Sequence, residues 1–250
     1  MDIYERISTK NIVFKNRVIM SPMATASADD DGHVFKKILD YYDEKTKDGV
    51  FSAVIVEHSY VDKTVMAQKN QMSISKDSDM EGMKKLADVI KKNGSLAILQ
   101  ISHSGSLGKK EVICETPVAP SPIANPARET GEIPRELSIY EIHNIMDKFI
   151  SAAIRDEKAG FDGVETHSVH AYLLDEFLSP LTNKREDDYG KDIYGRIKLH
   201  LEIIKGTREN LGDEYPILLR MGAGDFKEGG LSKEDSLIAA KAFEDAGVDV

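Results

Sequence analysis

Residues 161–172 read FDGVETHSVHAY. The short apolar run Gly163–Thr166 in this segment is typical of a buried strand. Two imidazoles and a phenol follow it directly, at His167, His170 and Tyr172. In parallel α/β folds the functional groups gather at the carboxyl ends of strands, where the loops converge. The segment therefore predicts a buried strand that ends at a functional site.

The residues before this strand predict a helix. Ser138 and Glu141 match the Ser-x-x-Glu capping box, and Gly160 is a typical helix stop. Between them, apolar residues recur every three or four positions and indicate one buried stripe. A second helix is predicted from Ser232 to Gly247, with Leu237, Ile238 and Phe243 as its core-facing residues.

The same alternation of strand and helix extends over the whole chain. Four more strand-like runs lie at Arg17–Met20, Ala53–Glu57, Leu96–Ile101 and Ile217–Met221, and a sixth begins at Val248. This alternation predicts an α/β fold with a parallel sheet. The 250 residues are close to the length of a complete TIM (β/α)8 barrel, yet they hold only five complete βα units. We therefore expect one domain, residues 1–250, that is incomplete at its C-terminus.

Two segments interrupt the pattern. Residues 105–134 contain five prolines and predict a long irregular excursion, of a length that is commonly functional. The charged run Lys184–Asp188 is interpreted more simply as a solvated loop.

The composition excludes several classes of protein. Lys plus Arg is 33 and Asp plus Glu is 43, so the net charge is −10 and nucleic acid is not an expected partner. The only cysteine, Cys114, cannot form an internal disulfide, which favours a reducing compartment. The N-terminal residues are too polar for an export signal, and no apolar run is long enough to cross a membrane. We expect a cytoplasmic protein without membrane contacts, and we leave homo-oligomerisation open.

The polar residues after the fourth strand allow three interpretations. His167 and His170 are suited to hydrogen-bond a substrate oxygen, with Tyr172 as the proton donor beside them. Alternatively, both histidines bind a metal ion together with Glu165 or Asp175. The third interpretation is two surface histidines at the start of a helix.

Other strand ends add polar groups. Gln100 lies within an apolar run, where its buried amide needs partners, either in a planar heterocycle or in a neighbouring strand. Arg220 ends an apolar strand, and we favour a ligand contact over an internal salt bridge. Pro22 ends the first strand, so the backbone of the following residues is free to meet a ligand.

Several motifs in register resemble the Old Yellow Enzyme family, the FMN-dependent ene reductases also called NADH:flavin oxidoreductases. They are FKNRVIMSPM at 14–23, the Gln100 strand with its HSG at 103–105, the block AGFDGVETHSVHAYLL at 159–174, and FLSP, NKR and DDYG within 177–190. The resemblance covers essentially the whole chain. It implies an FMN-binding TIM barrel, here truncated after about five βα units, with NADH or NADPH as the reductant.

The resemblance also implies roles for individual residues. His167 and His170 match the pair that hydrogen-bonds the substrate carbonyl, and Tyr172 matches the tyrosine that protonates the α-carbon. Gln100 matches the glutamine on the flavin pyrimidine edge, and Arg220 the arginine near flavin N1 and O2. The loop Ser21–Ala24, with Pro22 and Met23, matches the backbone that touches the flavin ring.

The chain departs from the family pattern at two positions. Ala24 stands where many relatives have a threonine or cysteine that bonds flavin O4, and Thr25 is expected to point elsewhere. His58 stands where small residues are more usual. It is expected either to contact the flavin and narrow the pocket, or to be a surface histidine.

The expected activity is reduction of the C=C bond of α,β-unsaturated carbonyl compounds by hydride transfer from flavin N5 and protonation by Tyr172. One alternative is a metal-dependent barrel lyase or hydrolase that uses His167, His170 and Glu165. The other is an inactive barrel fragment, because the loops that commonly hold a cofactor phosphate follow strands seven and eight. For that reason, residues 1–250 alone are expected to bind FMN poorly.

Overall fold

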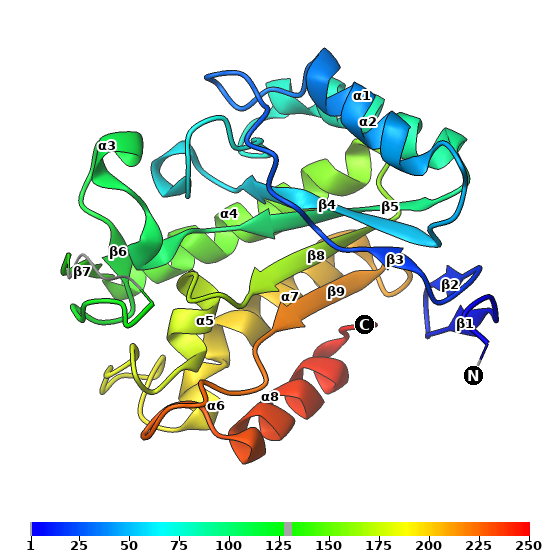
Figure 1. Ribbon diagram of the computed structural model, residues 1–250. Helices are drawn as coiled ribbons and strands as arrows, with labels where there is room; N and C mark the ends of the chain where they lie inside the picture. The colour runs from blue at the N-terminus through cyan, green and yellow to red at the C-terminus, as the bar shows by residue number, and fades with distance from the viewer. Residues whose placement is uncertain (1, 128–131) are drawn as a thin grey trace.

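The computed structural model describes residues 2–127 and 132–250. Its centre is a parallel sheet of five strands in the order β3-β4-β5-β8-β9 (Figure 1). The strands are β3 (Ile19–Met20), β4 (Ala53–Tyr60), β5 (Leu96–Ser102), β8 (Gly163–Ser168) and β9 (Ile217–Met221). All five predicted strands are confirmed. Three of them continue beyond the predicted carboxyl ends, so His167 lies within β8 and not after it.

Helices connect these strands and pack against one another in chain order on one side of the sheet (Figure 1). They are α1 (Lys36–Thr46), α2 (Met80–Lys92), α4 (Ile139–Lys158), α7 (Lys198–Leu211) and α8 (Lys233–Ala246). The predicted capping box at the start of α4 is present. The Ser138 side chain accepts from the backbone N–H of Glu141, and the Glu141 side chain accepts from the backbone N–H of Ser138. This succession of βα units is the predicted one.

Shorter elements lie at the two ends of the sheet. A small antiparallel hairpin, β1 (Ile7–Ser8) with β2 (Val13–Phe14), lies at the N-terminus, and β6 (Val118–Ala119) pairs in parallel with β7 (Arg135–Glu136). The remaining elements are η1 (Lys63–Val65), η2 (Asp77–Asp79), η3 (Gly105–Leu107), α3 (Lys110–Ile113), α5 (Leu173–Leu178) and α6 (Ile193–Arg196). The proline-rich excursion therefore contains short regular elements, and its residues 128–131 lie outside the described part of the chain.

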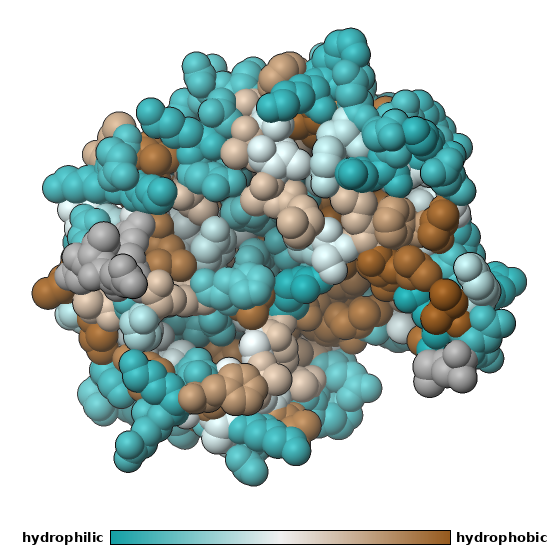
Figure 2. All heavy atoms as spheres, viewed as in Figure 1, coloured by the Kyte–Doolittle hydropathy of each residue, from teal (hydrophilic) through white to brown (hydrophobic). Residues whose placement is uncertain are grey.

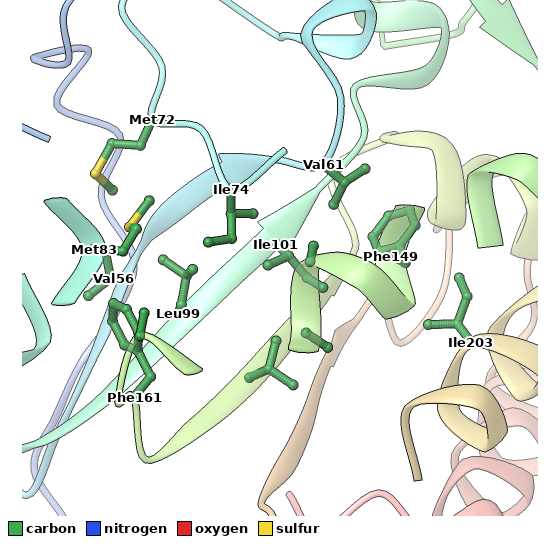
Figure 3. Close-up of a cluster of buried hydrophobic side chains, with 14 of the residues drawn as sticks. Val56, Val61, Met72, Ile74, Met83, Leu99, Ile101, Phe149, Phe161 and Ile203 are labelled. Atoms are coloured by element: carbon green, nitrogen blue, oxygen red, sulfur yellow. The ribbon is translucent and has the colours of Figure 1, made fainter. Parts of the chain in front are cut away.

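The main core lies between the sheet and its helices. Val56 of β4, Leu99 of β5 and Phe149 of α4 are fully buried there (Figure 3). A smaller cluster, including Phe14 and Ile98, fills the other side of the sheet at its amino end. In Figure 2 apolar side chains gather on the side of the N-terminal hairpin, while polar ones cover most of the visible face.

The last helix differs from its prediction. Phe243 is buried, but Leu237 is 62% exposed and Ile238 37% exposed, so the assignment of both to the core was wrong. Among the described residues they meet no further layer. After α8 the chain lies alongside β9, because Asp249 N donates to Ile217 O at 2.8 Å and Leu219 N donates to Val250 O at 3.0 Å. The sixth strand is thus started but not formed as a regular element.

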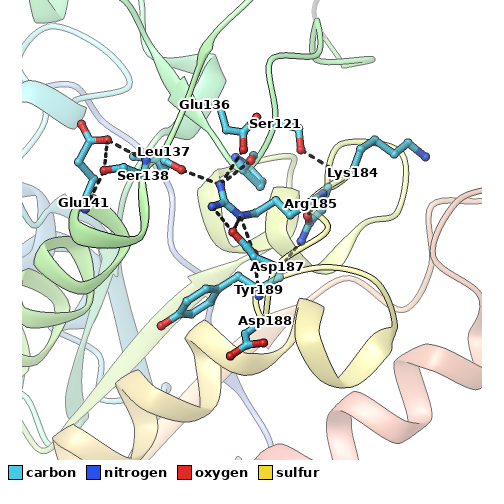
Figure 4. Close-up of polar contacts among 12 residues, drawn as sticks. Ser121, Glu136, Leu137, Ser138, Glu141, Lys184, Arg185, Asp187, Asp188 and Tyr189 are labelled. Carbon is cyan, nitrogen blue, oxygen red and sulfur yellow. Dashed lines mark hydrogen bonds and ion pairs between the residues drawn. The ribbon is translucent and has the colours of Figure 1, made fainter.

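The charged run at 184–188 is not simply a solvated loop. Arg185 is only 6% exposed, and its guanidinium donates to Pro120 O at 2.9 Å and to Leu137 O at 2.6 Å (Figure 4). The same guanidinium pairs with Asp187. Arg185 therefore fastens the loop after α5 to the excursion at Pro120 and to the residues that follow the excursion at Leu137.

Within residues 2–127 and 132–250, no helix combines the length and the apolarity needed to cross a membrane.

Candidate functional site

The predicted catalytic residues come together at the carboxyl end of β8. The rings of His167 and Tyr172 stack with centroids 4.8 Å apart and planes inclined by 21°. The His170 ring meets His167 edge-on at 5.4 Å. His167 is buried within the strand, whereas His170 is exposed on the turn that follows. The interpretation as two surface histidines is therefore wrong for His167.

Burial fixes the charge of His167 and Tyr172 near neutral pH. Loss of solvent, with smaller effects from His58, His170 and Arg220, lowers the pKa of His167 to about 3. Burial likewise raises the pKa of Tyr172 to about 12. A neutral imidazole therefore faces a protonated phenol. The Nδ1 atom of His167 is buried and has no hydrogen-bond partner among residues 2–127 and 132–250, which marks a position for a ligand atom.

Gln100 and Arg220 converge on Glu165. The three residues lie on neighbouring strands, and Glu165 Oε1 accepts from Gln100 Nε2 at 2.5 Å and from Arg220 Nε at 3.1 Å. Burial raises the pKa of Glu165, and Arg220 opposes that rise. Gln100 therefore has a partner in a neighbouring strand, which is one of the two alternatives expected for it. Arg220 forms an internal salt bridge, whereas a ligand contact was the favoured prediction. Its side chain is still 34% exposed and retains terminal N–H groups for a ligand.

The loop after β3 is largely exposed. Ser21, Met23 and Ala24 are exposed and Pro22 is half-buried. Thr25 points away, as predicted, because its hydroxyl donates to Glu57 Oε1 at 2.7 Å and its amide donates to Glu57 Oε2 at 2.6 Å. Glu57 therefore anchors this loop to the end of β4.

His58 is not a surface histidine. Its side chain belongs to the buried polar set, and its ring lies 6.0 Å from His167 and 5.6 Å from Tyr172 between centroids. Its Nδ1 lies 3.0 Å from Gln71 Nε2, which can only donate, so the proton of the neutral ring is on Nε2. Burial lowers the pKa of His58 to about 4, with a smaller effect from His170.

Several residues that support the site are not predicted from the sequence. Glu57 lies in a predicted strand without an expected role, and no role is expected for Gln71, Ser102 or Asn125. A carboxylate inside an apolar strand, as at Glu57, is the signal that could have found one of them. Nothing in the sequence pattern singles out the amides.

The metal-binding interpretation receives no support from the position of Glu165, whose contacts are with Gln100 and Arg220 and not with the histidines. Among the described residues, no group of three or more His, Cys, Asp and Glu side chains is arranged to hold a metal ion.

The residues fit a planar flavin. The largely exposed loop Ser21–Ala24 and the partly exposed guanidinium of Arg220 lie at the carboxyl end of the sheet, where the buried Nδ1 of His167 also lies. The loop offers backbone groups to a ring, and Arg220 offers one positive charge. These are the interactions by which proteins bind and tune a flavin.

Comparison with known proteins agrees with this fit. The model of the NADH:flavin oxidoreductase / NADH oxidase family matches residues 2–250. The chain is 40% identical to an NADH oxidase of Thermoanaerobacter brockii over 96% of its own length and 37% of the relative's. It is 38% identical to an NADPH dehydrogenase of Clostridium acetobutylicum, over 92% and 66%. The chain thus spans between about a third and two thirds of these two curated relatives.

Solved structures show the same fold. A 2-naphthoyl-CoA reductase superposes with a TM-score of 0.93 at 30% identity, covering 98% of this chain and 39% of that one. The Old Yellow Enzyme homologue of Zymomonas mobilis superposes at 0.88 and 26% identity, covering 100% and 72%. The parallel sheet described above is therefore part of a TIM barrel, and the predicted cofactors, FMN and a nicotinamide reductant, are confirmed as those of the family. As its sequence motifs indicated, the chain belongs to the NADH:flavin oxidoreductase / NADH oxidase family.

Proposed function

We propose that this chain forms most of the catalytic face of an FMN-dependent oxidoreductase that uses NADH or NADPH to reduce the C=C bond of α,β-unsaturated carbonyl compounds. The observation that carries the proposal is the cluster at the end of β8, where a neutral His167, whose buried Nδ1 has no hydrogen-bond partner among the described residues, lies beside a protonated Tyr172. Residues 1–250 belong to one FMN-binding barrel domain in this proposal, and the site of action is the cytoplasm.

His167 and His170 polarise the substrate. Each imidazole ring supplies at least one N–H donor, and two donors aimed at one carbonyl oxygen stabilise the negative charge that develops on it. Because His167 is buried, its donor acts where water does not compete. The hydrogen bonds draw electron density from the conjugated double bond toward the carbonyl oxygen, which leaves the β-carbon electron-poor, and they stabilise the enolate that results from hydride addition.

Tyr172 completes the reaction as the proton donor. A phenol whose pKa is raised to about 12 keeps its proton at neutral pH and releases it only to a strongly basic carbon such as the enolate α-carbon. His167 stacks on its ring and so limits its rotation.

Gln100, Arg220, His58 and the backbone of Ser21–Ala24 are the proposed cofactor-binding groups. FMN, when bound, supplies the hydride from its N5 position. Gln100 Nε2 is engaged by Glu165, so its carbonyl oxygen is left to accept from a ring N–H. Arg220 brings the positive charge that favours the reduced anionic flavin. His58 lies with its ring 5.6 Å from that of Tyr172 and supplies an Nε2–H donor.

The test separates the two half-reactions of the full-length protein by anaerobic stopped-flow absorbance. Flavin bleaching by NADPH measures the first step, and its reoxidation by cyclohex-2-enone measures the second. Tyr172→Phe is expected to slow the second step about 10²–10⁴-fold, the usual contribution of a general acid, and to leave the first within a factor of about three.

Tyr194→Phe is the matched control, because Tyr194 is 65% exposed on α6 and should change neither step. Enone reduction by the Tyr172→Phe variant at the wild-type rate would contradict the role of Tyr172. Absence of enone reduction in the wild type, with normal flavin bleaching, would limit the activity to flavin-dependent oxidation of the nicotinamide.

A further inference from the structure

We propose that Asp175 and Asn125 are positioning residues: together they hold the backbone turn at His170–Ala171 in a left-handed conformation, and this turn presents His170 and Tyr172 to His167. The contacts stand on the geometry alone, while their effect on catalysis rests on the proposed function.

The turn adopts a conformation that its residues do not favour. His170 has φ of 61° and Ala171 has φ of 59°, so two consecutive residues other than glycine lie in the left-handed region. Their Cβ atoms crowd the backbone there, and alanine has no polar side chain with which to compensate. Such a conformation persists only where the surroundings determine it, and it is typical of functional sites.

Two side chains hold both backbone polar groups of Ala171. Its N–H donates to Asp175 Oδ2 at 2.7 Å, and its carbonyl accepts from Asn125 Nδ2 at 3.1 Å. Asp175 lies in the first turn of α5, whereas Asn125 comes from the excursion before α4. The turn is therefore held from two independent segments.

The held turn sets the directions of the catalytic rings. Tyr172 follows Ala171 directly and is the N-cap residue of α5, and Leu173 N donates to His103 O at 3.1 Å. Both ends of the turn are thus fixed, which leaves the Tyr172 ring stacked on His167 and the His170 ring edge-on to it. Relaxation of Ala171 to a negative φ would redirect both side chains.

The clamp depends on the charge of Asp175. A carboxylate accepts a stronger hydrogen bond from an amide than a carboxylic acid does. Burial raises the pKa of Asp175 to about 6; the Ala171 hydrogen bond opposes this rise and Asp225, from the segment after β9, adds to it. Glu176 of the same helix is the other carboxyl group beside it, and His170 belongs to the turn itself. Acidification through about pH 6 is expected to weaken the clamp.

The experiment uses the full-length protein labelled with ¹⁵N-alanine. The amide signal of Ala171 is assigned by its loss in Ala171→Gly. In the wild type this signal is expected to shift with a midpoint near pH 6, because its acceptor becomes protonated. In Asp175→Asn, which keeps an oxygen acceptor without a titrating charge, the shift is expected to vanish.

Kinetics measure the consequence for the rings. Asp175→Ala removes the acceptor and is expected to lower kcat/KM for cyclohex-2-enone about tenfold or more, as expected for misplaced catalytic groups, with flavin bleaching by NADPH within about threefold. Asp175→Asn should remain within about threefold of the wild type at pH 7.5. Combining Asp175→Ala with Ala171→Gly should recover part of the loss, because glycine adopts positive φ freely.

Asp192→Asn is the control, because Asp192 also accepts from a backbone amide, Gly195 N at 3.0 Å, but does so at the start of α6. The proposal is overturned if Asp175→Ala leaves both the Ala171 signal and enone reduction unchanged. If the Ala171 signal responds as expected while the wild type reduces no enone, the clamp stands and the proposed function falls.

Discussion

The centre of the sheet and its β9 edge are built from similar sequences but differ in environment. In β5 six of seven residues are buried, whereas in β9 only the first two of five are. In the part of the chain that the structure describes, β5 has a hydrogen-bonded strand on either side, whereas β9 has a regular partner only in β8. An apolar cavity of about 550 Å³ lies beside β9, lined among others by Leu219, Met221, Leu237 and Phe243. Apolar sequence thus predicts a strand, but the neighbouring layers decide how much that strand stabilises the fold.

The largest effect is expected from a matched pair of substitutions, one in β5 and one in β9, that compares the centre of the sheet with its edge. Leu99→Ala in β5 is expected to lower the free energy of unfolding by about 2–5 kcal/mol, because it leaves a cavity in a closed core. Leu219→Ala in β9 should cost about 1 kcal/mol, since this side chain is only partly buried. Urea unfolding of both variants measures the difference, and equal losses would remove the distinction between centre and edge.

The buried carboxyl group of Glu176 on α5 should make the free energy of unfolding depend on pH. Glu176 accepts from Ser106 N at 3.1 Å and from Asn125 Nδ2 at 3.0 Å, and burial raises its pKa to about 8. The folded state therefore keeps a proton that the unfolded chain loses near its usual pKa, so stability falls as pH rises from about 4.5 to 8.

Glu176→Gln removes this ionisation. It is expected to raise the free energy of unfolding by about 2 kcal/mol at pH 8 and to change it little at pH 4.5. Glu244→Gln on the exposed face of α8 serves as the control at the edge and should leave the pH profile unchanged. A wild-type profile for Glu176→Gln would show that the carboxyl group is not buried as described.

The salt bridge between the two regions should give a smaller effect. Arg220→Ala removes the charge that lowers the pKa of Glu165, so that pKa rises further above its usual value. Stability should then fall by about 1–2 kcal/mol at pH 8 and by less at pH 4, where Glu165 is protonated in both states. Adding Glu165→Gln should abolish the pH dependence of the loss. Equal losses at both pH values would assign the effect to packing alone.

The smallest effect is expected at the exposed edge. Leu237→Lys on α8 should change the free energy of unfolding by less than about 0.5 kcal/mol, because the side chain is 62% exposed. The same substitution at Phe243, which is 1% exposed, should be severely destabilising. A large loss with Leu237→Lys would mean that another layer covers α8 in solution.

The sequence was sufficient to locate the five strands, because a buried parallel strand needs a continuous apolar run, and the caps at Ser138 and Ser232 marked the starts of two of the helices between or after them. It was also sufficient to place His167, His170 and Tyr172 at one strand end. It failed for Leu237 and Ile238, since helical periodicity reports a stripe but not what covers it. The sequence also did not predict the role of Asp175, which was considered only as a metal ligand. Its contact with the backbone depends on the positive φ angle of Ala171, and no residue pattern near Ala171 predicts that angle.

Arg185 has a consequence for how the protein opens. Its guanidinium binds the carbonyls of Pro120 and Leu137, which are 65 and 48 positions away along the chain. Neither the loop after α5 nor the excursion can detach while these bonds remain. We expect the two segments to behave as one cooperative unit in native-state hydrogen exchange, with amides such as those of Lys184 and Leu137 sharing a single opening free energy.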